Sequence, residues 1–292
     1  MKRLKSIVLS IVACLISFSL VTCEQLTKTT ENIASAEGYS LSSTSLFTAI
    51  NCIEEINQLD GKMPTGDIGI FKEGYTINYS DSSLSDGDGI EYILYFGPLK
   101  SSAPKGTIGG DGVYRAGKIV VSITGAWSEI NTSFLAIFSD FHTGDRSTMN
   151  EVKGKIGGTR KTSKSWQITF DKLLVQLNST DAMQEITGNC EIVTTAGNQT
   201  IGLLDNSQDV FGNGSGVLPS GESYSWTIDP NIPLKQQMEF GCAQTFVKGL
   251  VKITNSADNS ELQLDFDPYE NEACDRVAKA LIGRREFIFT IK

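Results

Sequence analysis

The sequence has a single histidine, His142, only seven prolines, and no Cys-x-x-Cys motif. Structural zinc sites are built from clustered cysteine and histidine ligands, so these absences argue against such a site. Twenty-eight glycines against seven prolines suit a chain with many turns and bulges. There is also no G-x-S-x-G nucleophile elbow, and no P-loop lysine follows the glycine-rich stretch 212–216, which we interpret as a turn or bulge.

The sequence contains no apolar run long enough to cross a membrane as a helix. The longest occupies residues 7–21, short of the ~20 residues that a span requires. Lys2, Arg3 and Lys5 precede it. A basic start, a short apolar body and a boundary near residue 22 are typical of a secretory signal. We therefore expect residues 1–22 to be removed on export, leaving a mature chain without a transmembrane helix.

Cys23 follows this segment directly, in the sequence Leu20-Val21-Thr22-Cys23. These four residues resemble a bacterial lipobox, in which signal peptidase cuts before a cysteine that is then diacylated. One acyl chain binds a membrane marginally, whereas two hold a protein firmly. We expect the lipid on Cys23 to be the membrane contact. The alternative is cleavage by the general signal peptidase, which would leave a soluble protein with a free thiol.

The balance of charge is acidic. Residues 1–22 carry three positive and no negative charges, so their removal changes the net charge from −9 to −12. Nucleic acids and anionic membrane surfaces are bound through basic patches. The charge therefore argues against nucleic acid as a partner, and leaves cations open.

The chain divides into a polar beginning, one helix and many strands. Residues 23–40 have few large apolar side chains and are expected to form a lipidated tether. Leu46, Ile50 and Ile53 recur at helical spacing. One of the hydroxyl residues 43–45 is expected to cap this helix, which should end near residues 60–61. Its apolar face predicts packing against a sheet.

The remaining chain predicts a mainly β protein. Segments rich in β-branched and aromatic residues alternate with Gly, Asn, Asp and Ser throughout residues 75–292. Trp166, Ile168 and Phe170, for example, share one face of a strand. We expect an antiparallel β-sandwich-like region. A faint internal similarity suggests two stacked modules: residues 41–180, with the helix, and residues 181–292.

Four cysteines remain once Cys14 is removed with the signal and Cys23 carries lipid: Cys52, Cys190, Cys242 and Cys274. Export permits disulfides, and four cysteines allow three pairings. Cys52 and Cys190 fit a disulfide or two small buried apolar side chains equally well.

The stretches "GKIVVSITG" (117–125), "CAQTFVKGLVKIT" (242–254) and "REFIFTI" (285–291) resemble a group of uncharacterised secreted lipoproteins of Bacteroidota type. The resemblance extends over roughly residues 95–292 and includes an acidic strand and a second cysteine before a terminal hairpin. It implies a β-rich fold with no known activity. It also implies a disulfide between Cys242 and Cys274.

Two acidic segments are candidate calcium sites. Asp86, Asp88 and Glu91 offer the oxygen ligands that calcium prefers, although the spacing of an EF-hand is absent. Residues 267–275 hold a second acidic cluster. A solvated loop is the alternative interpretation of both segments.

Trp127 is the candidate glycan contact, because it follows a glycine at a strand end and is expected to be exposed. Trp166 and Trp226 lie in alternating strands and are expected in the core. His142 has Asp140 and Asp145 nearby, but with no nucleophile elbow we interpret it as an ordinary loop histidine.

These features predict an exported lipoprotein of the outer membrane, on its periplasmic or cell-surface side. We expect a non-enzymatic structural or ligand-binding protein whose ligand is a carbohydrate or a protein. A glycan-binding or adhesin-like subunit is the alternative. A hydrolase would require a cleft with two carboxylates of different pKa, and no catalytic residue is assigned.

Overall fold

A computed structural model describes residues 33–57, 74–82, 87–177, 181–197, 206–239, 242–243 and 245–291. The predicted signal 1–22, the anchor Cys23, the first candidate calcium ligand Asp86 and the expected helix end at residues 60–61 lie outside these ranges. One helix, residues 33–57, precedes all of the strands.

The strands account for most of the described residues, as the sequence predicted. They are β1 (Thr76–Asp81), β2 (Ile90–Tyr95), β3 (Thr107–Ile108), β4 (Tyr114–Ile123), β5 (Ser133–Gly144), β6 (Met149–Arg160), β7 (Ser165–Gln176), β8 (Met183–Ala196), β9 (Ser207–Val217), β10 (Ser223–Ile228), β11 (Leu234–Gln237), β12 (Leu250–Asn255), β13 (Glu261–Asp265), β14 (Val277–Ile282) and β15 (Arg285–Thr290).

These strands form one open antiparallel sheet in the order β1-β2-β4-β5-β6-β7-β8-β9-β10-β12-β13-β14-β15, with β3 added beside β4 and β11 beside β9. The mainly β, sandwich-like prediction is confirmed. The sheet is not interrupted at the suggested boundary between modules 41–180 and 181–292. The strands on either side of it, β7 and β8, pair from Ser165↔Val193 to Gln176↔Met183. A single hydrophobic core contains side chains from both halves.

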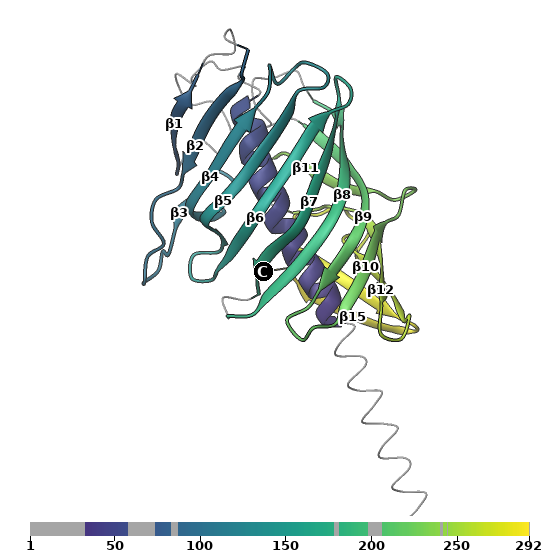
Figure 1. Ribbon diagram of the computed structural model, residues 1–292. Coiled ribbons are helices and arrows are strands. Elements are labelled where there is room, and N and C mark those ends of the chain that lie inside the picture. Colours follow the sequence, from purple (N-terminus) through teal and green to yellow (C-terminus); the bar gives the residue numbers. More distant parts are fainter. Residues whose placement is uncertain are drawn as a thin grey trace, which may run out of the picture.

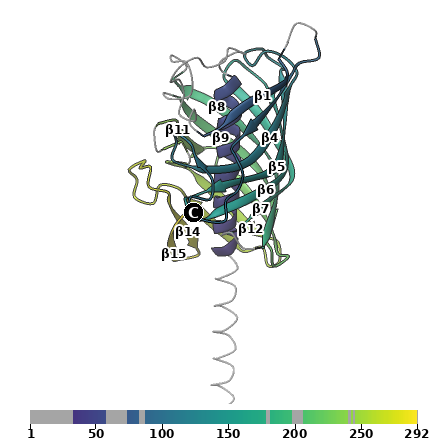
Figure 2. The same cartoon turned by 90° about the vertical axis from the view of Figure 1, so that its left-hand side faces the viewer.

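The helix lies inside the curve of the sheet, with strands on more than one side of it (Figures 1 and 2). Leu46, Ile50 and Ile53 are buried as their spacing predicted. The helix begins well before the expected cap at residues 43–45, however, so residues 33–40 are not tether. Ala36 and Tyr39 are buried in this first part, and the ring of Tyr39 lies 5.2 Å from that of Trp226.

Every helix residue from 35 to 57 except Glu37 is buried. Half of an amphipathic helix normally faces water, but here the polar half is covered as well. Buried polar groups need hydrogen-bond partners. Three glutamines on the sheet supply some of these partners. Gln184 Nε2 donates to the hydroxyl oxygen of Ser42 (3.1 Å), and Gln208 Nε2 donates to the Glu54 carboxylate (2.8 Å).

The third glutamine, Gln236, shares a hydrogen-bond acceptor with a residue of the helix. Gln236 Nε2 (2.6 Å) and Asn51 Nδ2 (3.0 Å) both donate to the carbonyl oxygen of Ala243. At the end of the helix, Asn57 Nδ2 donates to the hydroxyl oxygen of Tyr92 on β2 (2.6 Å). The helix is therefore held to the sheet by polar contacts along its length, in addition to its apolar packing.

The glycine-rich stretch 212–216 is part of strand β9, so its interpretation as a turn or bulge is wrong. Its glycines make room for large rings on β10. A Cβ on Gly214 would lie 2.6 Å from the ring of Trp226 and would also clash with the Thr187 carbonyl oxygen. A Cβ on Gly216 would meet the ring of Tyr224 in the same way. Trp226 and Tyr224 are both buried at this place.

The predicted disulfide between Cys242 and Cys274 is confirmed, with 5.1 Å between the two Cα atoms. Cys52 and Cys190 are both free and buried. Of the two possibilities that the sequence left open for them, the buried apolar role is the one observed.

Gly214→Ala is expected to lower the free energy of unfolding by about 1–3 kcal/mol, since the added methyl overpacks the site against Trp226 and a backbone carbonyl. Gly157→Ala is the matched control: it also lies in a strand, and its nearest neighbour, Thr169 Oγ1, would be 3.4 Å away. Urea unfolding followed by tryptophan fluorescence measures both. Equal stability of the two variants would contradict this account of β9.

Candidate functional site

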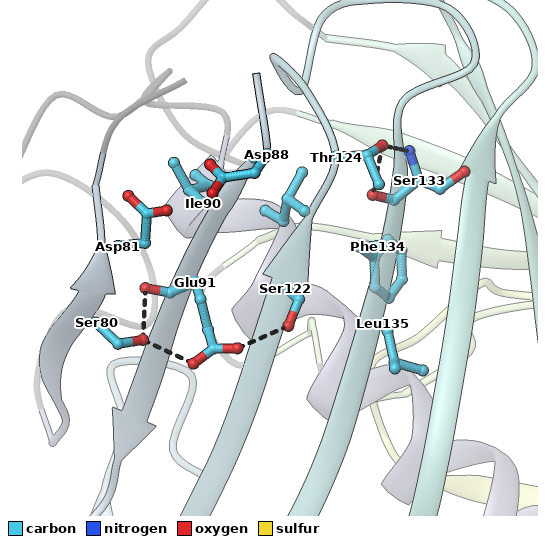
Figure 3. A pocket seen from close by; sticks show the side chains of 12 residues that line it. Ser80, Asp81, Asp88, Ile90, Glu91, Ser122, Thr124, Ser133, Phe134 and Leu135 are labelled. Atoms are coloured by element: carbon cyan, nitrogen blue, oxygen red, sulfur yellow. Dashed lines mark hydrogen bonds between the residues drawn. The ribbon is translucent and has the colours of Figure 1, made fainter. Parts of the chain in front are cut away.

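An open groove of about 570 Å³ lies at one end of β1, β2, β4 and β5 (Figure 3). Its polar lining consists of three carboxylates and four hydroxyls: Asp81, Asp88, Glu91, Ser80, Ser122, Thr124 and Ser133. Leu135, which is 40% exposed, adds an apolar wall. No lysine, arginine or histidine is among the described residues that line it.

The register of the sheet brings these side chains together. Glu91 on β2 pairs with Ser122 on β4, and Ser122 pairs with Leu135 on β5. Directly paired residues place their side chains on the same face. A bulge in β1 between Tyr79 and Asp81 adds Ser80 to this group, since a bulge redirects the side chains next to it.

Glu91 is the centre of the groove. Ser80 Oγ donates a hydrogen bond to Glu91 Oε1 (2.8 Å), and Ser122 Oγ donates to Glu91 Oε2 (3.2 Å). Two hydroxyls on neighbouring strands thus fix the orientation of one carboxylate, as Figure 3 shows. Each carboxylate oxygen can accept more than one hydrogen bond. Glu91 therefore keeps acceptor capacity for a ligand in the open groove.

The structure brings two of the three candidate calcium ligands to this groove, Asp88 and Glu91; the third, Asp86, lies outside the described residues. Within the described part of the chain, no three His, Cys, Asp or Glu side chains converge closely enough to hold a metal ion. Because Asp86 is not among the described residues, the calcium site stays a prediction.

The second acidic segment is arranged as a loop held by lysines. Glu272 receives hydrogen bonds from Lys235 Nζ (2.6 Å) and Lys248 Nζ (3.1 Å). These bonds, led by that from Lys235, lower the pKa of Glu272. Asp267 Oδ1 accepts from the backbone N–H groups of residues 271 and 272. The carboxylates of this segment thus stabilise the loop itself. This agrees with the alternative interpretation of the segment as a solvated loop.

The expectation that Trp127 is exposed is wrong. Only 7% of the residue is accessible, because its ring stacks on Trp166 with 4.0 Å between ring centroids. Phe134 lies beside both rings. The sequence suggested exposure from the preceding glycine, but the next strands fold over the indole. Trp127 therefore has no free ring face for a sugar. Trp166 and Trp226 are in the core, as predicted.

His142 lies in strand β5 and not in a loop. Its Nδ1 donates a hydrogen bond to the carbonyl oxygen of Asp140 (2.8 Å). That bond assigns the proton to Nδ1. The partner that a Ser-His-Asp arrangement would need on this nitrogen is a carboxylate, so the observed geometry gives no support to such an arrangement.

A buried charged cluster next to the helix could not be found from the sequence. Arg115 Nη1 donates to Asp111 Oδ1 (2.9 Å), a second bond joins Nη2 to Oδ2, and both residues are buried. Burial by itself lowers the pKa of Arg115, but the negative charge of Asp111 outweighs burial and raises it. Breaking a buried pair leaves an uncompensated charge, which is costly. Removing either partner alone would therefore destabilise the fold near β4.

The two free thiols are not activated. Burial raises the pKa of Cys52 and of Cys190 to about 12 in each case. The reactive form of cysteine is the thiolate. Both side chains are therefore protonated and inert at neutral pH, and they provide no nucleophile for catalysis.

In a chain carrying Cys14→Ser and Cys23→Ser, Ellman's reagent at pH 8 is expected to label no cysteine in the native state and two after unfolding in guanidinium. Burial and the raised pKa of both thiols are the reason. Reduction before unfolding is the control, and should raise the count to four by opening the Cys242–Cys274 bridge. Labelling of the native protein would contradict the inert role.

In the part of the chain that the structure describes, no helix has both the length and the apolar character that a membrane span requires. A scan against protein-family models and searches of curated proteins and of solved structures found no match to the chain.

Proposed function

We propose that the protein is an exported lipoprotein, anchored through Cys23, whose groove at the ends of β1, β2, β4 and β5 binds a ligand without transforming it. The basic start, short apolar run and cysteine at residue 23 support export and anchoring. The groove supports binding, since concave sites with a few convergent polar groups are where ligands bind.

The ligand class that fits the groove best is a neutral carbohydrate. The observation that carries this is the Glu91 carboxylate, fixed by Ser80 and Ser122 in an open groove. Carboxylates accept hydrogen bonds, and sugar hydroxyls donate them. Leu135 offers an apolar contact for the C–H face of a ring. The negative charge of Glu91 disfavours an acidic ligand at this place.

A non-enzymatic role fits the environments of the two free cysteines and of His142. The Cys52 and Cys190 thiols are buried and protonated, and the Nδ1 proton of His142 is bound to its own strand. The groove carboxylates bind hydroxyl groups in this account, and no bond is broken.

Glu91→Gln is expected to weaken glycan binding about tenfold or more, because it replaces a charged acceptor with a neutral one. The matched control is Glu191→Gln, on an exposed position of β8 away from the groove. Binding is measured on an array of neutral glycans, with thermal unfolding to verify the fold. If the two variants bind alike, or if no glycan binds, the proposed groove function is wrong.

Cys23→Ser is expected to abolish incorporation of labelled palmitate, because it removes the sulfur that carries the acyl group. Cys14→Ser is the control, since that residue would be removed with the signal. Palmitate labelling that persists in the Cys23→Ser variant would contradict the anchor. Protease treatment of intact cells then distinguishes the cell surface from the periplasm.

A further inference from the structure

We propose that the sugar-binding surface extends from the groove along the outer face of β2, β4 and β5, and that Tyr95 is the aromatic residue on which a sugar ring stacks. The outer face is the one that points away from the helix. The inference rests on the proposed function and deepens it: the ligand becomes an oligosaccharide, and the aromatic contact moves from Trp127 to Tyr95.

The register sets three rows of side chains on this face. The first row, in the groove, contains Glu91, Ser122 and Leu135. The second row contains Ile93, Val120 and Ile137. The third row contains Tyr95, Lys118 and Ser139. Because every second residue of a strand points to the same side, the three rows follow one another on a single surface.

Exposure separates this surface from the core. Tyr95 is 36% and Ile137 is 45% exposed, whereas their neighbours Leu94 and Ala136 are fully buried. Among the described residues, Tyr95 and Tyr269 are the only strongly exposed aromatics, and no described aromatic ring packs on Tyr95. Tyr269 lies in the loop between β13 and β14. Tyr95 is thus the exposed ring on the same face as the groove.

The order of chemistry along the rows matches an oligosaccharide. The groove offers carboxylates and hydroxyls, the second row offers aliphatic side chains, and the third row offers a ring beside Lys118 and Ser139. Sugars likewise combine apolar C–H faces with hydroxyl edges. Tyr95 is four positions after Glu91 in the strand, a distance of about 13 Å. A ligand that touches both therefore needs more than one sugar unit.

The charges on this surface favour a neutral chain. Asp81, Asp88 and Glu91 are at the groove end, while Lys118 and Lys155 are exposed near the other rows. An acidic chain would be repelled by the Glu91 carboxylate, and a strongly basic chain would be repelled by Lys118 and Lys155. A neutral oligosaccharide meets no such penalty at either end.

Full-length protein, purified from membranes in detergent, is tested against an array of neutral glycans of graded length. Tyr95→Ala is expected to weaken binding of the longer glycans about five- to tenfold, since an aromatic contact is lost. Disaccharides, held at the groove, should be unaffected. Tyr95→Phe should retain the affinity for long glycans, because its ring is intact. Tyr269→Ala is the matched control for an exposed tyrosine.

The results separate this inference from the proposed function. If Glu91→Gln weakens binding but Tyr95→Ala changes neither long nor short glycans, the groove function stands and the extended surface is overturned. If Tyr95→Ala weakens disaccharides and long glycans equally, the extension is also overturned. If the wild-type protein binds no neutral glycan, or if the face binds a protein instead, both are overturned.

Discussion

The burial of the helix over residues 33–57 inside the curved sheet is the constraint on which the rest of the structure depends. A helix satisfies its own backbone hydrogen bonds, but its polar side chains need partners once water is excluded. The inner face of the sheet supplies them through Gln184 and Gln208. It also supplies space, because Gly214 and Gly216 leave room for the rings of Trp226 and Tyr224.

Because the inner face of the sheet packs against the helix, the outer face is the one that a ligand can reach. Alternation along β2 illustrates the division of roles. Tyr92 points inward and accepts a hydrogen bond from Asn57 of the helix, while Glu91 points outward and is bonded by Ser80 and Ser122. The same strand thus stabilises the core with one residue and forms the candidate site with its neighbour. A change of register by one residue would exchange the two roles.

Local patterns predicted much of the fold, and their failures have a common cause. Strands were predictable because Trp166, Ile168 and Phe170 alternate within one segment. The start of the helix was not, because residues 33–45 are rich in serine and resemble a solvated tether. Their burial depends on glutamines more than a hundred residues away, as with Gln184 and Ser42. Trp127 was likewise misplaced because the ring stacked on it, Trp166, is remote in sequence.

The sequence by itself determined the mainly β class, the apolar face of the helix and the pairing of Cys242 with Cys274 through a resemblance. These follow from local periodicity and from recognisable segments. Of the candidate site it offered Asp88 and Glu91 as cation ligands. Only the tertiary structure decided that Glu91 meets two serines in a groove and that its face of β2 points away from the core. Register and long-range packing make that choice, because they decide which side chains meet.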